Sequence, residues 1–135
     1  MADQLIRVEA DGSISFGDYK LSAKSKLEDF PHSGDLYKVK TFNEITKLEK
    51  NSGFLYESVP GTSVSHFVES ESGVEFNVSG DKDAQITIGL AEDTEYDVFL
   101  DGENTGSMST GLSGKLSLSV ELSDKGSVKV RISKK

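Results

Sequence analysis

The chain has 135 residues, a formal net charge of −8, and neither Trp nor Cys. A chain of this length buries roughly two-thirds of its unfolded surface and can build one domain around its own core. The absence of Cys excludes disulfide frameworks, Cys-ligated zinc, iron–sulfur clusters and thiol nucleophiles. The acidic balance disfavours nucleic acid as a partner, because affinity for nucleic acid comes from Lys and Arg side chains that neutralise phosphates.

The N-terminal residues Met1–Arg7 contain neither the basic region nor the apolar stretch of an export signal. No window of the sequence approaches the roughly 18 apolar residues of a membrane-spanning helix. We therefore expect no membrane insertion, and a protein that is cytoplasmic or released, for example as part of a virion.

Short alternating segments separated by turn residues begin at the N-terminus. Leu5–Ala10 and Ser13–Phe16 flank Asp11-Gly12, a strong turn signal, and predict a hairpin. The apolar positions change parity after Phe16, which predicts a β-bulge at Gly17-Asp18.

The next segments differ in the strength of their pattern. Residues 22–35 contain a proline and a Ser-Gly pair and predict a loop, whereas Leu36–Phe42 alternates and predicts a strand. Asn43–Lys50 has apolar residues at helical spacing. We expect a strand there, because the following Asn51-Ser52-Gly53 is typical of a hairpin turn.

The second half alternates more regularly. Strands are predicted around Val64–Val68, Val74–Val78, Ile86–Leu90, Tyr96–Leu100, Lys115–Leu122 and Val128–Ile132. The turn-forming residues Ser123–Gly126 predict that the last two strands form a hairpin. Strands spaced about ten residues apart predict an antiparallel β-sandwich of about ten strands, of jelly-roll or immunoglobulin/fibronectin-III type. We expect a single domain over residues 1–135, with residues 59–62 as the one place for an internal division.

Charge is unevenly distributed along the second half. Residues 69–103 contain eleven acids and a single base, Lys82, whereas residues 104–135 contain six bases and two acids. Such runs usually form solvated faces of a soluble protein. The alternative is a pair of complementary patches that steer head-to-tail association between copies.

Reactive chemistry is sparse. The two histidines do not have the spacing of a metal site, and we expect His32 in an exposed loop and His66 on a strand near the surface. No phosphate-binding loop, dinucleotide fingerprint or nucleophile elbow occurs.

Acidic residues offer the remaining site chemistry. A carboxylate pair for glycoside hydrolysis or a weak calcium site has four candidate residues, Asp81, Asp83, Asp101 and Glu103. They fall in predicted turns, among them Asp101-Gly102 at the end of the Tyr96–Leu100 strand, and in turns an Asp side chain usually bonds the local backbone. We therefore expect no catalytic residue, no metal and no cofactor.

Aromatic residues bear on carbohydrate binding. Sugar-binding sandwiches commonly stack exposed flat side chains on sugar rings, and Trp, the commonest of these, is absent. Four tyrosines are candidate binding residues if the fold exposes them: Tyr19, Tyr37, Tyr56 and Tyr96. Their places in alternating strands mostly predict core packing instead.

Part of the second half resembles a known module. The segment TEYDVFLDGENTG at Thr94–Gly106, followed by SGKLSLSV at Ser113–Val120, resembles the last strands of fibronectin-III-like or immunoglobulin-like modules attached to bacterial carbohydrate-active enzymes. The resemblance covers residues 94–120 and implies a β-sandwich accessory module.

The whole chain, with DLYKVKTF at Asp35–Phe42 and YESVPG at Tyr56–Gly61, resembles short clostridial proteins labelled endosialidase. Propeller sialidases bind the sialate carboxylate through three arginines and carry repeats that end in Trp. This chain has only two arginines, Arg7 and Arg131, and no Trp. The resemblance therefore carries over no catalytic residue, and it implies a relation to a non-catalytic part of phage or surface proteins.

Together these patterns predict a non-catalytic β-sandwich that acts through its surfaces, as a self-associating structural subunit or a protein-interaction module. The terminal strands Leu5–Ala10 and Ser127–Ile132 are candidates for exchange between copies, because edge strands offer unpaired backbone groups. The expected partner is a second copy or another protein. A carbohydrate-binding accessory module, with a glycan as partner, is the alternative, and a glycoside-active enzyme is the third hypothesis.

Overall fold

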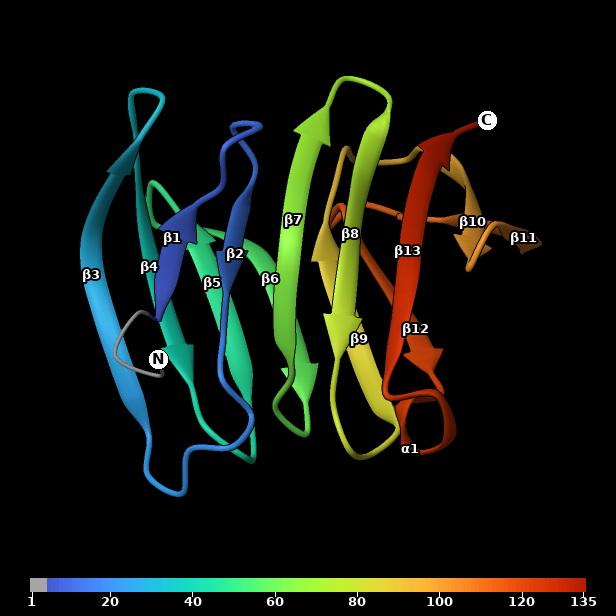
Figure 1. Ribbon diagram of the computed structural model, residues 1–135. Helices are drawn as coiled ribbons and strands as arrows, with labels where there is room; N and C mark the ends of the chain where they lie inside the picture. Colours follow the sequence, from blue (N-terminus) through green and yellow to red (C-terminus); the bar gives the residue numbers. More distant parts are fainter. Residues whose placement is uncertain (1–4) are drawn as a thin grey trace.

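The computed structural model describes residues 5–135 as two antiparallel β-sheets that lie face to face (Figure 1). The seven-stranded sheet has the order β1-β2-β7-β8-β13-β10-β11 and comprises β1 (Ile6–Val8), β2 (Ile14–Phe16), β7 (Ser63–Ser70), β8 (Gly73–Ser79), β10 (Glu95–Leu100), β11 (Glu103–Ser109) and β13 (Ser127–Lys134). The six-stranded sheet has the order β12-β9-β6-β5-β4-β3 and comprises β3 (Ser25–His32), β4 (Asp35–Thr41), β5 (Thr46–Lys50), β6 (Gly53–Val59), β9 (Ala84–Gly89) and β12 (Lys115–Val120). The prediction of an all-β, sandwich-like fold is confirmed, with thirteen strands in the described residues rather than about ten.

The core lies between the two sheets and is built from alternate residues of the strands. In β12, for example, Leu116, Leu118 and Val120 are buried while the residues between them are exposed. Phe16, Tyr56, Phe67 and Phe76 form the aromatic centre, with edge-to-face pairs such as Phe16–Tyr56 at a centroid distance of 5.2 Å. Edge-to-face geometry is favourable because the positive edge of one ring meets the negative face of the next.

Two predicted hairpin turns form as expected. Between β5 and β6, both central residues have positive φ, 51° at Asn51 and 68° at Ser52. Between β10 and β11, Asp101 and Gly102 have φ of 51° and 84°. Two successive positive φ values match the right-handed twist of the flanking strands, which is why Asn, Asp and Gly occupy such turns.

The predicted loop at residues 22–35 is wrong, because most of this segment forms β3. This strand lies at the edge of the six-stranded sheet, and all eight of its residues are exposed or half-buried. A strand that is solvated on both faces needs no alternation of apolar and polar residues, so its sequence lacks the usual strand pattern.

The predicted bulge at Gly17-Asp18 is also wrong. Strand β2 ends at Phe16, and the Gly17 N–H donates to the Leu5 carbonyl. The irregularity instead lies in the pairing of β2 with β7, where His66 has a φ of 54°. The extra residue lies in β7, so it does not alter the alternation of apolar and polar residues in the β2 sequence.

The predicted hairpin of the last two strands is wrong as well. Strand β12 pairs with β9 in the six-stranded sheet, whereas β13 pairs with β8 and β10 in the other sheet. The helix α1 (Leu122–Lys125) carries the chain across, and the buried Leu122 anchors it in the core. A four-residue turn looks alike in sequence whether it returns within one sheet or crosses to the other.

Candidate functional site

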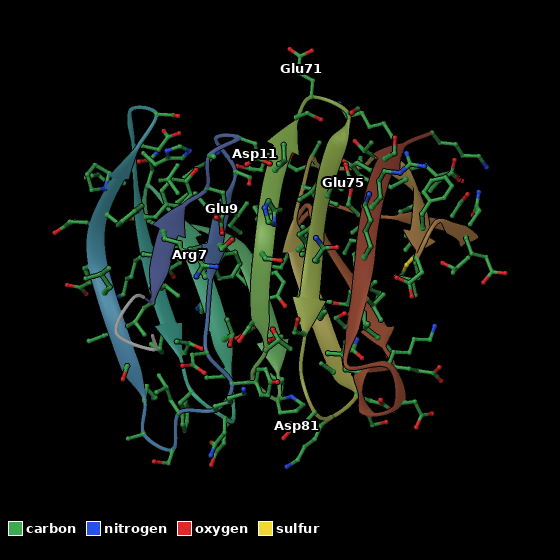
Figure 2. All side chains as sticks on the ribbon, in the orientation of Figure 1. Arg7, Glu9, Asp11, Glu71, Glu75 and Asp81 are labelled. Atoms are coloured by element: carbon green, nitrogen blue, oxygen red, sulfur yellow. The ribbon has the colours of Figure 1, made fainter. Side chains whose placement is uncertain are left out.

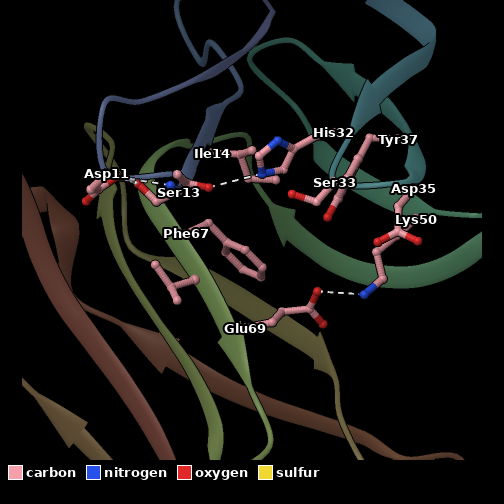
Figure 3. Close-up of a pocket in the computed structure, with 12 residues that line it drawn as sticks. Asp11, Ser13, Ile14, His32, Ser33, Asp35, Tyr37, Lys50, Phe67 and Glu69 are labelled. Atoms are coloured by element: carbon pink, nitrogen blue, oxygen red, sulfur yellow. Dashed lines mark hydrogen bonds and ion pairs between the residues drawn. The ribbon is translucent and has the colours of Figure 1, made fainter.

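A cleft of about 360 Å³ opens between the two sheets at one end of the sandwich (Figure 3). We call it the end cleft. Its walls come from the β1–β2 turn and β7 on one sheet and from the β3–β4 turn, β4 and β5 on the other. Ile14 and Phe67, both only 3% exposed, supply apolar surface, and polar side chains line the remainder. Clefts of this size that combine apolar surface with a few polar groups are typical ligand sites.

Two contacts between the sheets flank this cleft. The His32 Nε2 atom lies 3.0 Å from the Gly12 carbonyl oxygen, and it must donate because a carbonyl can only accept. The Lys50 ammonium donates to Glu69 at 2.8 Å. The expectation of His32 in an exposed loop is therefore wrong. It lies at the end of β3, half-buried, where pairing with β4 brings it beside the β1–β2 turn. His66 lies on β7 and is exposed, as predicted.

Tyr37 is the buried polar side chain of the cleft. It is only 6% exposed, and burial raises the pKa of its phenol. Figure 3 shows its ring extending from β4 with the hydroxyl oxygen inside the cleft. No group in residues 5–135 forms a hydrogen bond with that hydroxyl, which instead keeps contact with the open space of the cleft.

Tyr56 shows the opposite arrangement. It is fully buried, and its hydroxyl lies 2.7 Å from the Thr62 Oγ1 atom, which also lies 2.8 Å from the Ser58 hydroxyl. Thr46 donates to the Thr62 carbonyl and accepts from its N–H. The buried hydroxyls of this cluster satisfy one another, and burial of the Tyr56 phenol raises its pKa. Such a network fixes the packing of β5 and β6.

The other tyrosine candidates give no stacking platform. Tyr96 is 1% exposed, and its hydroxyl accepts the Ala91 N–H. Tyr19 is half-buried, with the Lys20 ammonium 5.9 Å from its ring centroid. Three of the four tyrosines are thus buried, and the prediction of core packing holds for Tyr37, Tyr56 and Tyr96.

The charged groups of the cleft are already partnered. Asp11 accepts from the Ser13 hydroxyl and N–H, which hold its pKa below the ordinary value. Asp35 accepts from the Asn51 amide at 2.8 Å. Hydrogen bonding to Glu69 raises the pKa of Lys50. The cleft therefore presents three carboxylates against one ammonium, with each carboxylate held by a neighbour.

The acidic turn residues do not assemble a metal site. Asp83 accepts from the N–H and hydroxyl of Ser123, which lowers its pKa, and Asp101 accepts from the Lys129 N–H. Asp81 follows the end of β8, and its side chain points away from the sandwich (Figure 2). Glu103 is the first residue of β11. Across residues 5–135, no group of three or more His, Asp or Glu side chains could hold a metal ion.

The segregation of charge along the sequence is largely resolved within the fold. Strand β13 lies between β8 and β10, so bases of the last segment meet acids of the preceding one. The ion pairs are Lys129–Glu75 at 3.0 Å, Lys135–Glu95 at 3.6 Å and Lys125–Asp101 at 3.7 Å. Other acids are spread out, with Glu71 and Asp81 at opposite ends of the molecule (Figure 2).

The four edge strands form a second candidate surface. Three of them are short or irregular. Strand β1 has three residues, and β3 has a register shift and contains Pro31. Strand β11 has an extra residue where its pairing with β10 shifts, next to Gly106, whose φ is 127°. Bulges, prolines and short length are the usual means by which proteins protect sheet edges. Strand β12 has none of them and pairs with β9 over six consecutive residues without a shift.

The pairing register between β12 and β9 shows which backbone groups of β12 point to the free edge. Leu90 lies opposite Gly114 and donates its N–H to the Gly114 carbonyl at 2.7 Å. Bonded and unbonded pairs alternate in an antiparallel ladder. The even-numbered residues of β12 therefore bond β9, while Ser117 and Ser119 direct their N–H and C=O groups to the free edge. The Lys115 N–H, on the same side, donates to the Ser113 hydroxyl at 3.2 Å.

Comparisons with known proteins do not assign the chain to a family. No family model matches the chain, and searches of curated proteins and of solved structures gave no match. The resemblances to fibronectin-III-like modules and to endosialidase-labelled proteins stay predictions. In residues 5–135, no helix is long and apolar enough to span a membrane.

Proposed function

We propose that this protein is a non-catalytic β-sandwich subunit that self-associates by adding a strand of a second copy to the free edge of β12. The observation that carries the proposal is the regularity of this edge, which offers the N–H and C=O groups of Ser117 and Ser119 and the C=O group of Lys115 in one row. A strand added there gains main-chain hydrogen bonds without any rearrangement of the sheet.

The ends of β12 favour a second copy as the partner. Lys115 begins the strand and Glu121, which is extended and exposed, follows it. When Ser117 lies opposite Ser119 of an antiparallel second copy, Lys115 lies opposite Glu121 at both ends. Opposite charges that face each other across strands are favourable, whereas like charges would be unfavourable.

An exposed apolar side chain near this edge adds to the proposal. Leu112, in the connection that leads into β12, is 82% exposed. Apolar groups exposed beside a free edge gain from burial when a strand is added.

The terminal strands are less suitable for exchange than the sequence suggested. Strand β13, which contains Ser127–Ile132, is bonded on both sides in the middle of its sheet. Its removal would open the core. Strand β1 is an edge, but it has only three residues.

Two of the acidic side chains, Asp11 and Asp83, are poorly suited to act as a general acid. The Asp11 and Asp83 carboxylates have pKa values below their ordinary value, because hydroxyl and N–H donors stabilise the ionised form. A general acid in glycoside hydrolysis needs the opposite shift.

The test is light scattering over a concentration series in low and high salt, with Ser117→Pro as the variant. Proline removes an outward N–H that the β9–β12 pairing does not use, and proline is tolerated on edge strands where its nitrogen faces solvent. Ser117→Ala keeps the N–H and is the matched control. We expect the wild type and Ser117→Ala to associate and Ser117→Pro to be a monomer with an unchanged circular dichroism spectrum.

The salt dependence of association distinguishes strand pairing at β12 from attraction between charged patches. Main-chain pairing persists in high salt, whereas attraction between exposed charges is screened over about 8–10 Å. A wild-type protein that is monomeric at every concentration and ionic strength would overturn the proposal. Equal association of Ser117→Pro and wild type would place the interface elsewhere and reject β12.

A further inference from the structure

The Tyr37 hydroxyl in the end cleft forms no hydrogen bond that would stabilise the fold of residues 5–135. Tyr37 is buried like Tyr56, yet of the two hydroxyls only that of Tyr56 has hydrogen-bond partners among residues 5–135. Burying a hydroxyl normally requires a hydrogen-bond partner, because an unpaired hydroxyl loses its bonds to water. The Tyr37 hydroxyl keeps its access to water only through the cleft, at a place that a bound molecule can occupy.

The groups around this hydroxyl define the chemistry of the ligand. Glu69 and Asp35 have acceptor capacity beyond their existing bonds, and Lys50 uses one of its three N–H groups on Glu69. The Ser33 hydroxyl lies on the same rim. Val68, which is 46% exposed, supplies apolar surface in the same cleft. A matching ligand carries several groups that both donate and accept, together with an apolar face.

The charge of the cleft narrows the choice further. Three carboxylates, Asp11, Asp35 and Glu69, face one ammonium, Lys50, so the local field repels anions. A metal cation finds no site here, because no group of three or more His, Asp or Glu side chains in residues 5–135 could hold one. A neutral ligand needs neither a cationic nor a metal-binding site.

We propose that the end cleft binds a neutral, hydroxyl-rich small molecule of the size of one or two hexose units, with the Tyr37 hydroxyl as a direct hydrogen-bond partner. The volume of about 360 Å³ suits a ligand of this size. The ring hydroxyls of a sugar both donate and accept hydrogen bonds, and the C–H face of its ring contacts the exposed Val68 on the cleft wall. Recognition here works through hydrogen bonds in a cleft and not through stacking on exposed aromatic rings. The proposal is independent of self-association, because β12 does not line the cleft.

The experiment is a ¹H–¹⁵N chemical-shift titration of the full chain with a panel of methyl glycosides. The neutral probes are methyl glucoside, methyl galactoside, methyl mannoside and N-acetylglucosamine. The disaccharide built from two units of each sugar is tested as well. Glucuronate and N-acetylneuraminate are the anionic probes, and putrescine is the cationic one. We expect saturable shifts at His32, Tyr37 and Glu69 with at least one neutral probe, and none with the charged probes.

Tyr37→Phe is the variant, because it removes the hydroxyl and keeps the ring in the core. Loss of one hydrogen bond to the ligand weakens binding by roughly three- to tenfold. Tyr19→Phe is the matched control, since Tyr19 lies outside the cleft and its change leaves binding unaltered. Three results would overturn the proposal: no saturable shift with any neutral probe, tighter binding of a charged probe, or unchanged affinity in Tyr37→Phe. The free energy of unfolding of Tyr37→Phe, measured alongside, separates a binding effect from a folding defect.

Discussion

The six-stranded sheet ends in two edge strands of opposite character. Strand β3 is exposed on both faces, contains Pro31, and has a register shift where Asp29 adopts a φ of 58°. Strand β12 is straight, alternates buried and exposed residues, and has no shift. One edge is therefore protected against strand addition and the other is not. Within one sheet this contrast identifies β12 as the surface where pairing with another chain meets the least resistance.

The two strands also depend on different interactions for their own position. The core fixes β12, whose Leu118 is 8% exposed, whereas Leu27 of β3 is 40% exposed and contributes little burial. Strand β3 is held mainly by its bonds to β4. An edge that is packed into the core stays flat and ordered, which is what a strand-binding surface requires.

The largest predicted effect is on the free energy of unfolding, when a core side chain of β12 is truncated and compared with an exposed one of β3. Leu118→Ala should lower the free energy of unfolding by about 2–4 kcal/mol, because it leaves a cavity between the sheets. Leu27→Ala should lower it by about 0.5 kcal/mol or less, since the side chain is largely solvated. Urea denaturation of both variants measures the difference. Equal losses would contradict the contrast drawn between the two edges.

An intermediate effect is expected at the helix that follows β12. Asp83 accepts from Ser123, and its folded-state pKa is depressed, so its stabilisation is present above the ordinary pKa of about 4 and is lost as the pH falls through the folded value. Asp83→Asn should therefore lower the melting temperature at neutral pH and leave it unchanged at about pH 2. Thermal melts at both pH values test this.

Asp29→Asn in the β3 bulge is the control for that measurement. Asn adopts positive φ as readily as Asp, and no hydrogen bond to the Asp29 carboxylate exists in residues 5–135. Its melting temperature should match the wild type at both pH values. A loss of stability in Asp83→Asn that persists at low pH would show that the carboxylate charge is not the cause.

The smallest predicted effect concerns the exposed ion pairs. Lys129–Glu75 on the seven-stranded sheet and Lys38–Glu28 beside β3 lie at 3.0 and 3.5 Å, and both are solvated. Lys129→Ala and Lys38→Ala should each change the free energy of unfolding by less than about 1 kcal/mol. Association should be unaffected by either. A large change in association with Lys129→Ala would point to charged patches in place of a strand edge.

The sequence predicted those parts of the fold that alternation and turn residues encode locally. Strands β4 and β12 and the turns at Asn51-Ser52 and Asp101-Gly102 follow from nearby residues alone. Strand β3 could not be predicted in this way, because solvent on both faces removes the pattern. The sheet to which β13 belongs depends on pairing with β8 and β10, which no local turn signal specifies.

The candidate sites were only partly accessible to sequence reasoning. Alternation in β4 predicted that Tyr37 is buried. It did not predict that the hydroxyl has no partner in the described part of the chain, because that depends on the cleft formed by segments of both sheets. The contact of His32 with Gly12 and the pairing of Lys50 with Glu69 join distant segments. The alternation of Ser117 and Ser119 with apolar residues in β12 was visible in the sequence, whereas the place of this strand at a sheet edge was not.

Amide hydrogen exchange of β12 as a function of protein concentration tests self-association through this edge most directly. In the monomer, the Ser117 and Ser119 amides point to solvent and should exchange quickly, while the Leu116 and Leu118 amides bond β9 and should be protected. Association is predicted to protect Ser117 and Ser119 as concentration rises and to leave the β3 amides unchanged. Ser117 and Ser119 amides that stay unprotected in an associated protein would contradict the proposal.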